Sequence, residues 1–161
     1  MQKTGPTLDD ALQAGDGRYA IVAARWHAEI MDRLIEGARQ TLLDRGAAES
    51  QIDLFRVPGS FELPLACDRA ARSGAYAAVI ALGVVIQGET PHHDYINLSV
   101  AQGLMQAGQN SQVPILFGVL TCHTIEQAMD RAGGSVGNKG EEAALAAIEM
   151  VHLLRQMPTD A

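Results

Sequence analysis

The stretch GVVIQGETPHHDYI, residues 83–96, decides how this chain of 161 residues folds. It joins the most apolar run of the sequence, Ala77 to Ile86, to its densest group of titratable side chains. An uninterrupted apolar run rich in Val and Ile is typical of a strand buried on both faces. Gly88 ends the run, and apolar residues recur at helical spacing from Tyr95 onward. We therefore expect a buried strand, a polar loop and the start of a helix.

The same alternation of apolar strands and amphipathic helices extends in both directions along the chain. We expect strands at Tyr19–Ala24, Ile52–Val57, Ala77–Ile86 and Val113–Leu120. We expect helices at His27–Arg45, Glu62–Ser73, from Tyr95 onward, Thr124–Arg131 and Glu141–Met157, with a glycine-rich turn over Ala132–Gly140. Strands that alternate with helices and carry no hairpin signals predict an α/β fold. The predicted architecture is a three-layer sandwich, in which a central four-stranded parallel sheet has helices on both faces.

Length and composition indicate a single domain over residues 1–161. The chain contains 47% hydrophobic and only 4% aromatic residues, which predicts a core of Ala, Val, Ile and Leu. Residues 1–17 are polar and contain glycine and proline breakers, so we expect them to form a mobile amino-terminal arm. Cys67 and Cys122 form no CxxC pair, and we expect two reduced, buried thiols.

Net charge limits the partners of the protein. The charge is −7, the pI is near 5.1 and no Lys/Arg cluster occurs, so we expect no nucleic-acid partner and no anionic-membrane patch. The apolar runs are too short to span a bilayer, and the first residues lack the apolar centre of a signal peptide. We therefore expect a cytoplasmic protein, in which single basic residues remain possible ligands for small anions.

Polar and aromatic residues follow each predicted strand, at the point where the strand ends. Because the carboxyl ends of parallel strands share one edge of the sheet, these residues are expected to converge on a ligand site. The four groups are Arg25 to His27, Pro58 to Glu62, Gly88 to Asp94, and Thr121 to His123.

The adjacent histidines, His92 and His93, are the main candidates for acid–base chemistry. Neighbours in a loop or a first helical turn cannot both reach one ligand, so we expect one histidine to be functional and the other structural. Two exposed loop histidines without a role are the alternative. A metal site built from His92, Asp94 and His123 is also possible, although the spacing matches no established ligand motif.

Other candidates each have a functional and a structural interpretation. Trp26 either stacks on a planar heterocycle or plugs the strand–helix junction. Phe61 and Glu62 either contact a ligand or serve the start of a helix. Arg131 and Lys139, beside the glycine-rich turn, either bind a phosphate or are solvated helix charges.

Four motifs in order resemble the lumazine synthase family, which catalyses the penultimate step of riboflavin biosynthesis. They are RWH at residues 25–27, PGSFELP at 58–64, GVVIQGETPHHDYI at 83–96 and IEQAMDRAGGSVGNKGEEAA at 125–144. The resemblance runs from about Tyr19 to the last helix and implies a flavodoxin-like fold. It implies a transferase that condenses 5-amino-6-(D-ribitylamino)uracil with 3,4-dihydroxy-2-butanone 4-phosphate to 6,7-dimethyl-8-ribityllumazine, without a metal or another cofactor.

The resemblance also implies a role for each matching residue. His92 is expected to be the proton carrier. Trp26 is expected to stack on the pyrimidine, with Phe117 packed against the ring. The implied contacts of the ribityl chain and the ring edge are Ser60, Phe61 and Glu62, and the pocket backbone is Val84, Val85 and Ile86. The implied phosphate contacts are Glu89, Thr90 and Arg131, with Lys139 also in the substrate site.

Assembly follows from the same resemblance. Family members form homopentamers whose active sites lie between subunits, so Phe117 and Arg131 are expected to come from the adjacent chain. The short turn after Arg131 also allows a hollow icosahedral capsid, and riboflavin synthase is a possible partner. The sequence departs from the family at Trp26, His27, Gln87 and Pro91, where Phe, Asn, Arg and Thr are more usual.

Two other functions stay open at this point. One is a non-catalytic flavin-binding or shell-forming protein of the same fold, against which the presence of His92, Arg131 and Lys139 argues. The other is a metal-assisted hydrolase that uses the histidine loop.

Overall fold

The central element of the computed structural model, which describes residues 11–159, is a parallel four-stranded sheet with the order β2-β1-β3-β4. Its strands are β1 (Tyr19–Ala24), β2 (Ile52–Val57), β3 (Ala78–Ile86) and β4 (Ile115–Cys122). The predicted α/β sandwich of the flavodoxin-like kind is confirmed, and two strands begin and end where the sequence predicts.

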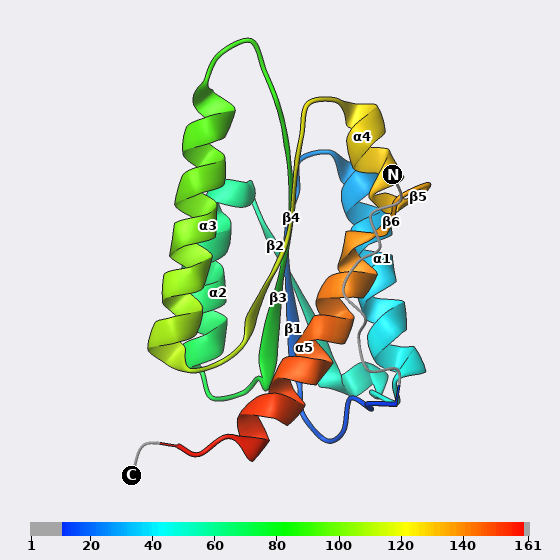
Figure 1. Cartoon of the computed structure of the whole chain (residues 1–161), viewed down its shortest axis with the longest axis vertical. Coiled ribbons are helices and arrows are strands. Elements are labelled where there is room, and N and C mark those ends of the chain that lie inside the picture. Colours follow the sequence, from blue (N-terminus) through cyan, green and yellow to red (C-terminus); the bar gives the residue numbers. More distant parts are fainter. Residues whose placement is uncertain (1–10, 160–161) are drawn as a thin grey trace.

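Helices cover both faces of the sheet (Figure 1). One face carries α1 (Ala28–Asp44), α4 (Ile125–Asp130) and α5 (Lys139–Gln156); the other carries α2 (Leu63–Arg72) and α3 (His92–Ser111). Two short 3₁₀ helices, η1 (Glu49–Gln51) and η2 (Ser60–Glu62), flank β2. The three layers therefore leave the carboxyl edge of the sheet to the connecting loops.

The core consists of two apolar layers, one on each side of the sheet. Successive residues of β1 belong to different layers. Ile21 packs with Leu34 and Ile148 toward α1 and α5, while Val22 packs with Leu63 toward α2 and α3. Side chains on a strand alternate between its faces, so each of the central strands contributes to both layers. The core is dominated by Ala, Val, Ile and Leu, as the composition predicts.

Two expected helix starts were wrong. Helix α3 begins at His92 rather than at Tyr95, because a first turn can be polar and shows no apolar periodicity. Helix α5 begins at Lys139 rather than at Glu141, because the Asn138 side chain caps it by accepting hydrogen bonds from Gly140 N–H (2.8 Å) and Glu141 N–H (3.3 Å).

The expected turn over residues 132–140 was also wrong, since it contains a small antiparallel hairpin. Its strands are β5 (Ala132–Gly134) and β6 (Gly137–Asn138). Gly133 and Gly137 have φ values of 95° and 100°, which residues with a side chain rarely adopt. Such a short hairpin carries no apolar alternation, so the sequence pattern could not reveal it.

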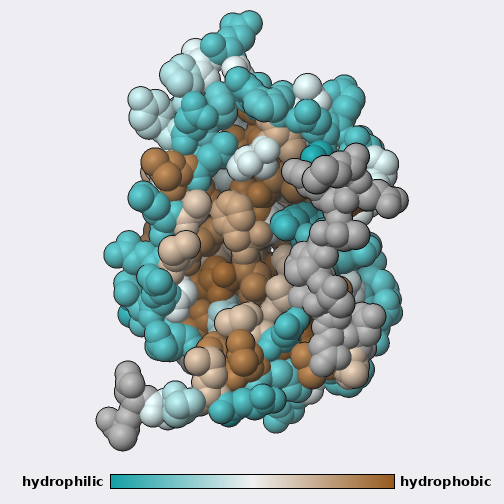
Figure 2. All heavy atoms as spheres, viewed as in Figure 1, coloured by the Kyte–Doolittle hydropathy of each residue, from teal (hydrophilic) through white to brown (hydrophobic). Residues whose placement is uncertain are grey.

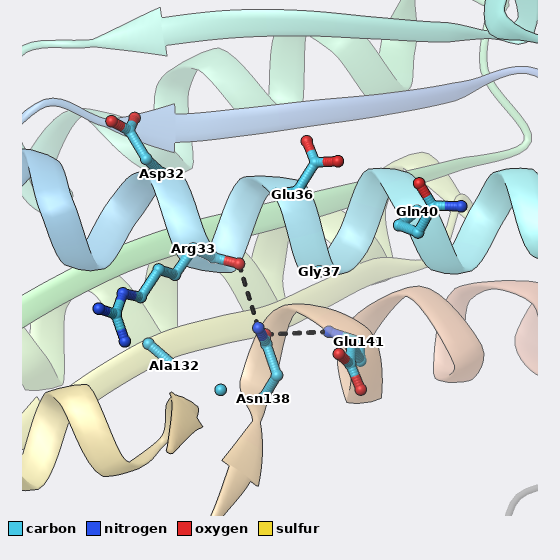
Figure 3. Close-up of a pocket in the computed structure, with 9 residues that line it drawn as sticks. Asp32, Arg33, Glu36, Gly37, Gln40, Ala132, Asn138 and Glu141 are labelled. Atoms are coloured by element: carbon cyan, nitrogen blue, oxygen red, sulfur yellow. Dashed lines mark hydrogen bonds between the residues drawn. The ribbon is translucent and has the colours of Figure 1, made fainter.

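Asn138 also fixes helix α5 to helix α1. Its amide donates to the carbonyl oxygen of Arg33 at 3.1 Å, as Figure 3 shows. The two helices are close at this point: a Cβ on Gly140 would lie 2.0 Å from the carbonyl oxygen of Leu34, and a Cβ on Gly37 would lie 2.6 Å from the Asn138 side chain. Close helix contact thus depends on two glycines and one buried amide.

The predicted amino-terminal arm, residues 1–17, falls partly outside the described residues, which begin at Ala11. From Leu12 to Gly17 the chain is held against the domain. Tyr19 donates its hydroxyl hydrogen to the Ala14 carbonyl (2.8 Å), and the Gln51 amide donates to the carbonyls of Gly15 (3.0 Å) and Gly17 (2.7 Å). No helix among residues 11–159 has the length and apolarity needed to cross a membrane.

Both cysteines are free and buried, in agreement with the sequence. Burial raises the pKa of the Cys67 thiol to about 12, compared with 9.0 for an exposed thiol.

Above pH 9.0 the unfolded chain therefore releases a proton from Cys67 that the folded chain keeps, and the free energy of unfolding falls as pH rises. We expect this thiol to contribute about 1.4 kcal/mol of lost stability per pH unit. In urea unfolding above pH 9.0, Cys67→Ala should show a correspondingly shallower pH slope, whereas equal slopes would contradict the assignment.

Candidate active site at the carboxyl edge of the sheet

The ends of β1, β2 and β3 bring most of the predicted site residues to one edge. The aligned strand ends are Ala24 and Val57, and the register also pairs β1 with β3 along its length. Two aromatic side chains stand out there, because Trp26 is 69% exposed and Phe61 is 59% exposed. Large apolar side chains that are exposed and not packed in the core are typical of a binding surface.

The turn after β1 depends on a left-handed residue. His27 has φ 59° and ψ 60° and directly precedes helix α1. This conformation costs a residue with a side chain roughly 1–2 kcal/mol, and most of all a β-branched one. The turn therefore determines the direction of the chain at Trp26, between β1 and α1.

We expect His27→Val to lower the free energy of unfolding by about 2 kcal/mol and to weaken binding at Trp26. The matched variant His27→Gly should be as stable as the parent or more stable, because glycine adopts positive φ freely. Urea unfolding of the two variants decides the point. Equal stabilities for the Val and Gly variants would mean that this turn is not strained.

The side chains of Trp26 and Glu62 both lie next to Gly59. Glu62 Oε2 accepts a hydrogen bond from Gly59 N–H at 2.9 Å. A Cβ on Gly59 would lie 3.3 Å from both Glu62 Oε2 and Trp26 Cδ1. Glu62 thus supports the turn into η2, next to the exposed indole of Trp26.

The hydroxyl of Ser60 is buried without a hydrogen-bond partner among the described residues. It packs against β3 at Gly83, where a Cβ would lie 2.6 Å from Ser60 Oγ. An unpaired buried hydroxyl is costly, and a ligand hydroxyl or carbonyl would satisfy it. Beyond Gly83, Val84 is buried while Val85 and Ile86 are half-buried at the end of β3.

The two histidines differ in their surroundings. His93 has a ring Nδ1 3.1 Å from the Thr90 carbonyl oxygen and a ring Nε2 3.0 Å from the Asp94 carboxylate. The His92 ring is exposed, and no hydrogen bond to it is found within residues 11–159. Glu89 and Thr90 precede it, exposed in the loop. The expected division therefore fits His93 as the structural histidine and His92 as the free one.

Three predicted residues lie away from this group. Phe117 is paired with Ala81 in the middle of β3, whereas the strand end Ile86 is paired with Cys122. Ala81 is in turn paired with Val22 of β1, so Phe117 lies two strands away from β1, about 10 Å at about 4.8 Å per strand, and level with a residue two before the end of β1. Arg131 and Lys139 lie at the ends of α4 and α5, on the face of the sheet opposite α2 and α3. In the described residues, Arg131 and Lys139 form their contacts with α4 and α5, and Phe117 is separated from β1 by β3.

Arg131 and Lys139 are near each other through the backbone, since Lys139 N–H donates to the Arg131 carbonyl at 2.9 Å. The Lys139 ammonium is paired with Glu142 at 3.0 Å, and Arg131 Nη1 donates to the Gln127 carbonyl at 3.0 Å. Burial raises the pKa of the Cys122 thiol, and the nearby Arg131 guanidinium opposes that rise. The guanidinium is therefore close to the end of β4.

No group of three or more His, Cys, Asp and Glu side chains in residues 11–159 is arranged to hold a metal ion. The metal site considered from His92, Asp94 and His123 is therefore not formed. Asp94 contacts His93 instead, and His123 bonds to the side chain of Gln87.

The sheet ends in an apolar edge at β4. Figure 2 shows apolar side chains gathered between the two helical layers, where β4 lies in Figure 1. A groove of about 410 Å³ runs here, lined by residues that include Met105, Ile115, Leu116 and Leu154. Phe117 is 42% exposed on the same strand. The groove drawn in Figure 3, of about 590 Å³, is lined instead by mostly charged and polar residues of α1, the β5–β6 hairpin and the start of α5, and by none of the predicted site residues.

Sequence patterns missed three residues that shape the site. A glycine inside a buried strand is a signal of close approach, and it would have identified Gly83 as the partner of Ser60. An Asn before an acidic first turn is a helix-start signal, and it would have identified Asn138. The spacing of Thr124 and Gln127 is the capping-box pattern of a helix start, and it would have identified Gln127, whose side chain accepts from His123 N–H.

The sequence of the chain is similar to the sequences of known proteins. A family profile described as 6,7-dimethyl-8-ribityllumazine synthase matches residues 16–155. A protein of that name from Halorhodospira halophila is 55% identical over 142 residues, which is 88% of this chain and 91% of the relative. Proteins of the same name from Xanthomonas euvesicatoria pv. vesicatoria and Stenotrophomonas maltophilia are 49% and 52% identical, over 91% and 88% of this chain and 96% and 91% of theirs.

Proposed function

The chain belongs to the 6,7-dimethyl-8-ribityllumazine synthase family, and we infer that its residues carry out the family's reaction as follows. The reaction is the condensation of 5-amino-6-(D-ribitylamino)uracil with 3,4-dihydroxy-2-butanone 4-phosphate, which gives 6,7-dimethyl-8-ribityllumazine, phosphate and two molecules of water. The protein is thus a transferase of riboflavin biosynthesis. The non-catalytic flavin-binding alternative is not favoured.

One observation supports the assignment of the site most strongly. The exposed Trp26 and the unpaired hydroxyl of Ser60 follow the ends of β1 and β2, and the free ring of His92 follows the loop after the neighbouring strand β3. An aromatic face, a hydroxyl and an imidazole are the groups needed to stack a pyrimidine, bind a polyol chain and move protons.

The uracil half of the site is assigned to the β1, β2 and β3 ends. Trp26 stacks on the pyrimidine, and the segment from Ser60 to Glu62 holds the ribityl chain and the ring edge. The backbone of residues 84–86 lines the pocket. The butanone phosphate is held by Glu89 and Thr90 through backbone and hydroxyl groups and by Arg131, with Lys139 nearby.

The complete site needs a second copy of the chain. Phe117 lies two strands away from β1, about 10 Å across the sheet, and Arg131 follows α4, which lies on the face of the sheet opposite α2 and α3 (Figure 1). The exposed apolar edge at β4 is the kind of surface that another subunit covers. We assign Phe117, Arg131 and Lys139 to the site of the neighbouring subunit, in a homopentamer or a multiple of pentamers. A cytoplasmic location and a riboflavin synthase partner belong to the same proposal.

The condensation depends on binding of the two substrates and on proton transfer. The uracil amine attacks the ketone carbon, and loss of water leaves an imine. Elimination breaks the carbon–oxygen bond to phosphate and leaves an enol, which takes up a proton and becomes a methyl ketone. The ribitylamino nitrogen then attacks this ketone carbon and closes the ring with loss of a second water. His92 carries protons between these steps, while Arg131 holds the leaving phosphate. Fixing two reactants supplies roughly 7–11 kcal/mol in favourable cases, more than general acid–base help provides, so orientation dominates.

The reaction is tested by incubating purified, chelator-treated protein with both substrates and following lumazine by absorbance above the uncatalysed background. Enzyme-dependent product is the expected result. Background alone, from folded and assembled protein, would contradict it.

The shared site is tested by complementation. If Arg131 serves the neighbouring subunit, co-assembly of His92→Ala and Arg131→Ala chains recreates intact sites in about one quarter of positions. The mixed assembly should then exceed the mean activity of the two separate variants. Mixing that gives only the mean would place His92 and Arg131 of one site on one chain.

A further inference from the structure

A chain of hydrogen bonds connects the end of β3 with Arg131. Gln87 N–H donates to the Cys122 carbonyl at 2.9 Å and so continues the pairing of β3 with β4. The Gln87 side chain accepts a hydrogen bond from His123 Nδ1.

The next contacts lead from His123 into α4. His123 N–H donates to Gln127 Oε1 at 3.0 Å. Gln127 N–H donates to Thr124 Oγ1 at 3.2 Å, and the Gln127 carbonyl accepts from Arg131 Nη1 at 3.0 Å. The Arg131 guanidinium is thus bonded back onto the helix that carries it.

Helix α4 needs such support. It has only six residues, and isolated helices of this length are unstable in water. Buried Ala128 holds one side of it against the domain. The contacts of Gln127 and Thr124 fix its first turn relative to the strand ends, and a tilt of this turn would move Arg131 with it.

We propose that Gln87, His123 and Gln127 are positioning residues that orient Arg131 toward the phosphate of the butanone substrate. The inference rests on the proposed function, which gives Arg131 its phosphate. Bidentate phosphate binding requires a defined guanidinium plane, and small displacements at a binding group are costly. Gln87 is itself neutral and engaged with His123, so it acts through Arg131 rather than on the substrate.

The test compares steady-state constants for both substrates. His123→Ala and Gln127→Ala should raise KM for the butanone phosphate by about two- to tenfold, the factor that corresponds to one net hydrogen bond. The KM for ribitylaminouracil and kcat should stay unchanged. His123→Asn, whose amide can still donate to Gln87, should restore much of the loss. Gln40→Ala is the matched control, since it removes an exposed hydrogen bond to Asp44 elsewhere, and should have no effect.

Two further measurements make the inference refutable. In the Arg131→Ala background, adding His123→Ala should change KM no further; an additional loss there would overturn the proposal, as would equal rises in both KM values. Titration with inorganic phosphate should show weaker binding to His123→Ala and to Arg131→Ala than to the parent. Absence of lumazine with the parent protein would be failure of the proposed function. In that case the phosphate titration still tests the positioning role, and equal binding of inorganic phosphate by all three proteins would overturn it.

Discussion

Replacing His92 with alanine is expected to lower kcat by about a hundredfold, at the lower end of what general acid–base catalysis contributes. Activity should remain readily measurable, because the fixed orientation of the two substrates supplies most of the rate enhancement. Arg131→Ala should lower kcat/KM at least as much, since it removes a phosphate anchor. Lumazine formation under saturating and limiting concentrations of each substrate gives both constants.

His93→Ala is the natural control for the histidine experiment. The His93 ring already contacts the Thr90 carbonyl and the Asp94 carboxylate, so its loss should loosen the start of α3 and lower stability rather than remove a proton carrier. A His92→Ala protein that binds both substrates but makes no product would show that orientation is not dominant. A larger kcat loss in His93→Ala would reverse the assignment of the two histidines.

Gly140→Ala is expected to have the largest effect on stability. The added methyl would lie 2.0 Å from the Leu34 carbonyl oxygen, and backbone atoms of α1 cannot rotate away as a side chain can. Separating α1 from α5 also breaks the hydrogen bond from Asn138 to the Arg33 carbonyl. We expect a loss of about 3 kcal/mol or more, a large share of the roughly 5–15 kcal/mol of a whole domain. Urea unfolding at fixed protein concentration, or the yield of folded protein, measures it.

Two other glycines make this experiment specific. A Cβ on Gly88 would meet nothing within 4 Å, so Gly88→Ala should leave stability nearly unchanged. Gly37→Ala should have an intermediate effect, because its Cβ would meet the Asn138 side chain at 2.6 Å rather than backbone. If Gly140→Ala is as stable as Gly88→Ala, the close contact of α1 with α5 is not required.

The sequence predicts the sheet well because apolar runs and breakers mark the strand ends. β2 ends at Val57, directly before Pro58 and Gly59, as expected. Helix starts are harder, since a cap such as Asn138 or a polar first turn such as that at His92 leaves no apolar period. The hairpin of β5 and β6 is too short for any pattern.

For the site, the convergence of polar loops at one edge follows from parallel strands alone. That geometry predicts the grouping of Trp26, Ser60 and His92 without any knowledge of the side-chain contacts. It does not predict that Phe117 and Arg131 lie elsewhere, because their distances depend on strand register and on the packing of α4. Nor does it predict the link from Gln87 to Gln127, which joins residues far apart in the sequence.

The Asn138 contact with Arg33 spans 105 residues, and this separation has a consequence for protein synthesis. At about 5–20 residues per second, helix α1 exists for roughly 5–20 s before the ribosome adds the residue that secures it. During this time the apolar stripe of α1 lacks its cover from α5, and the nascent chain is open to chaperones and proteases. Ribosome-bound chains that end before Asn138 should therefore be cleaved within α1 by a protease that spares longer chains with α5 fully emerged.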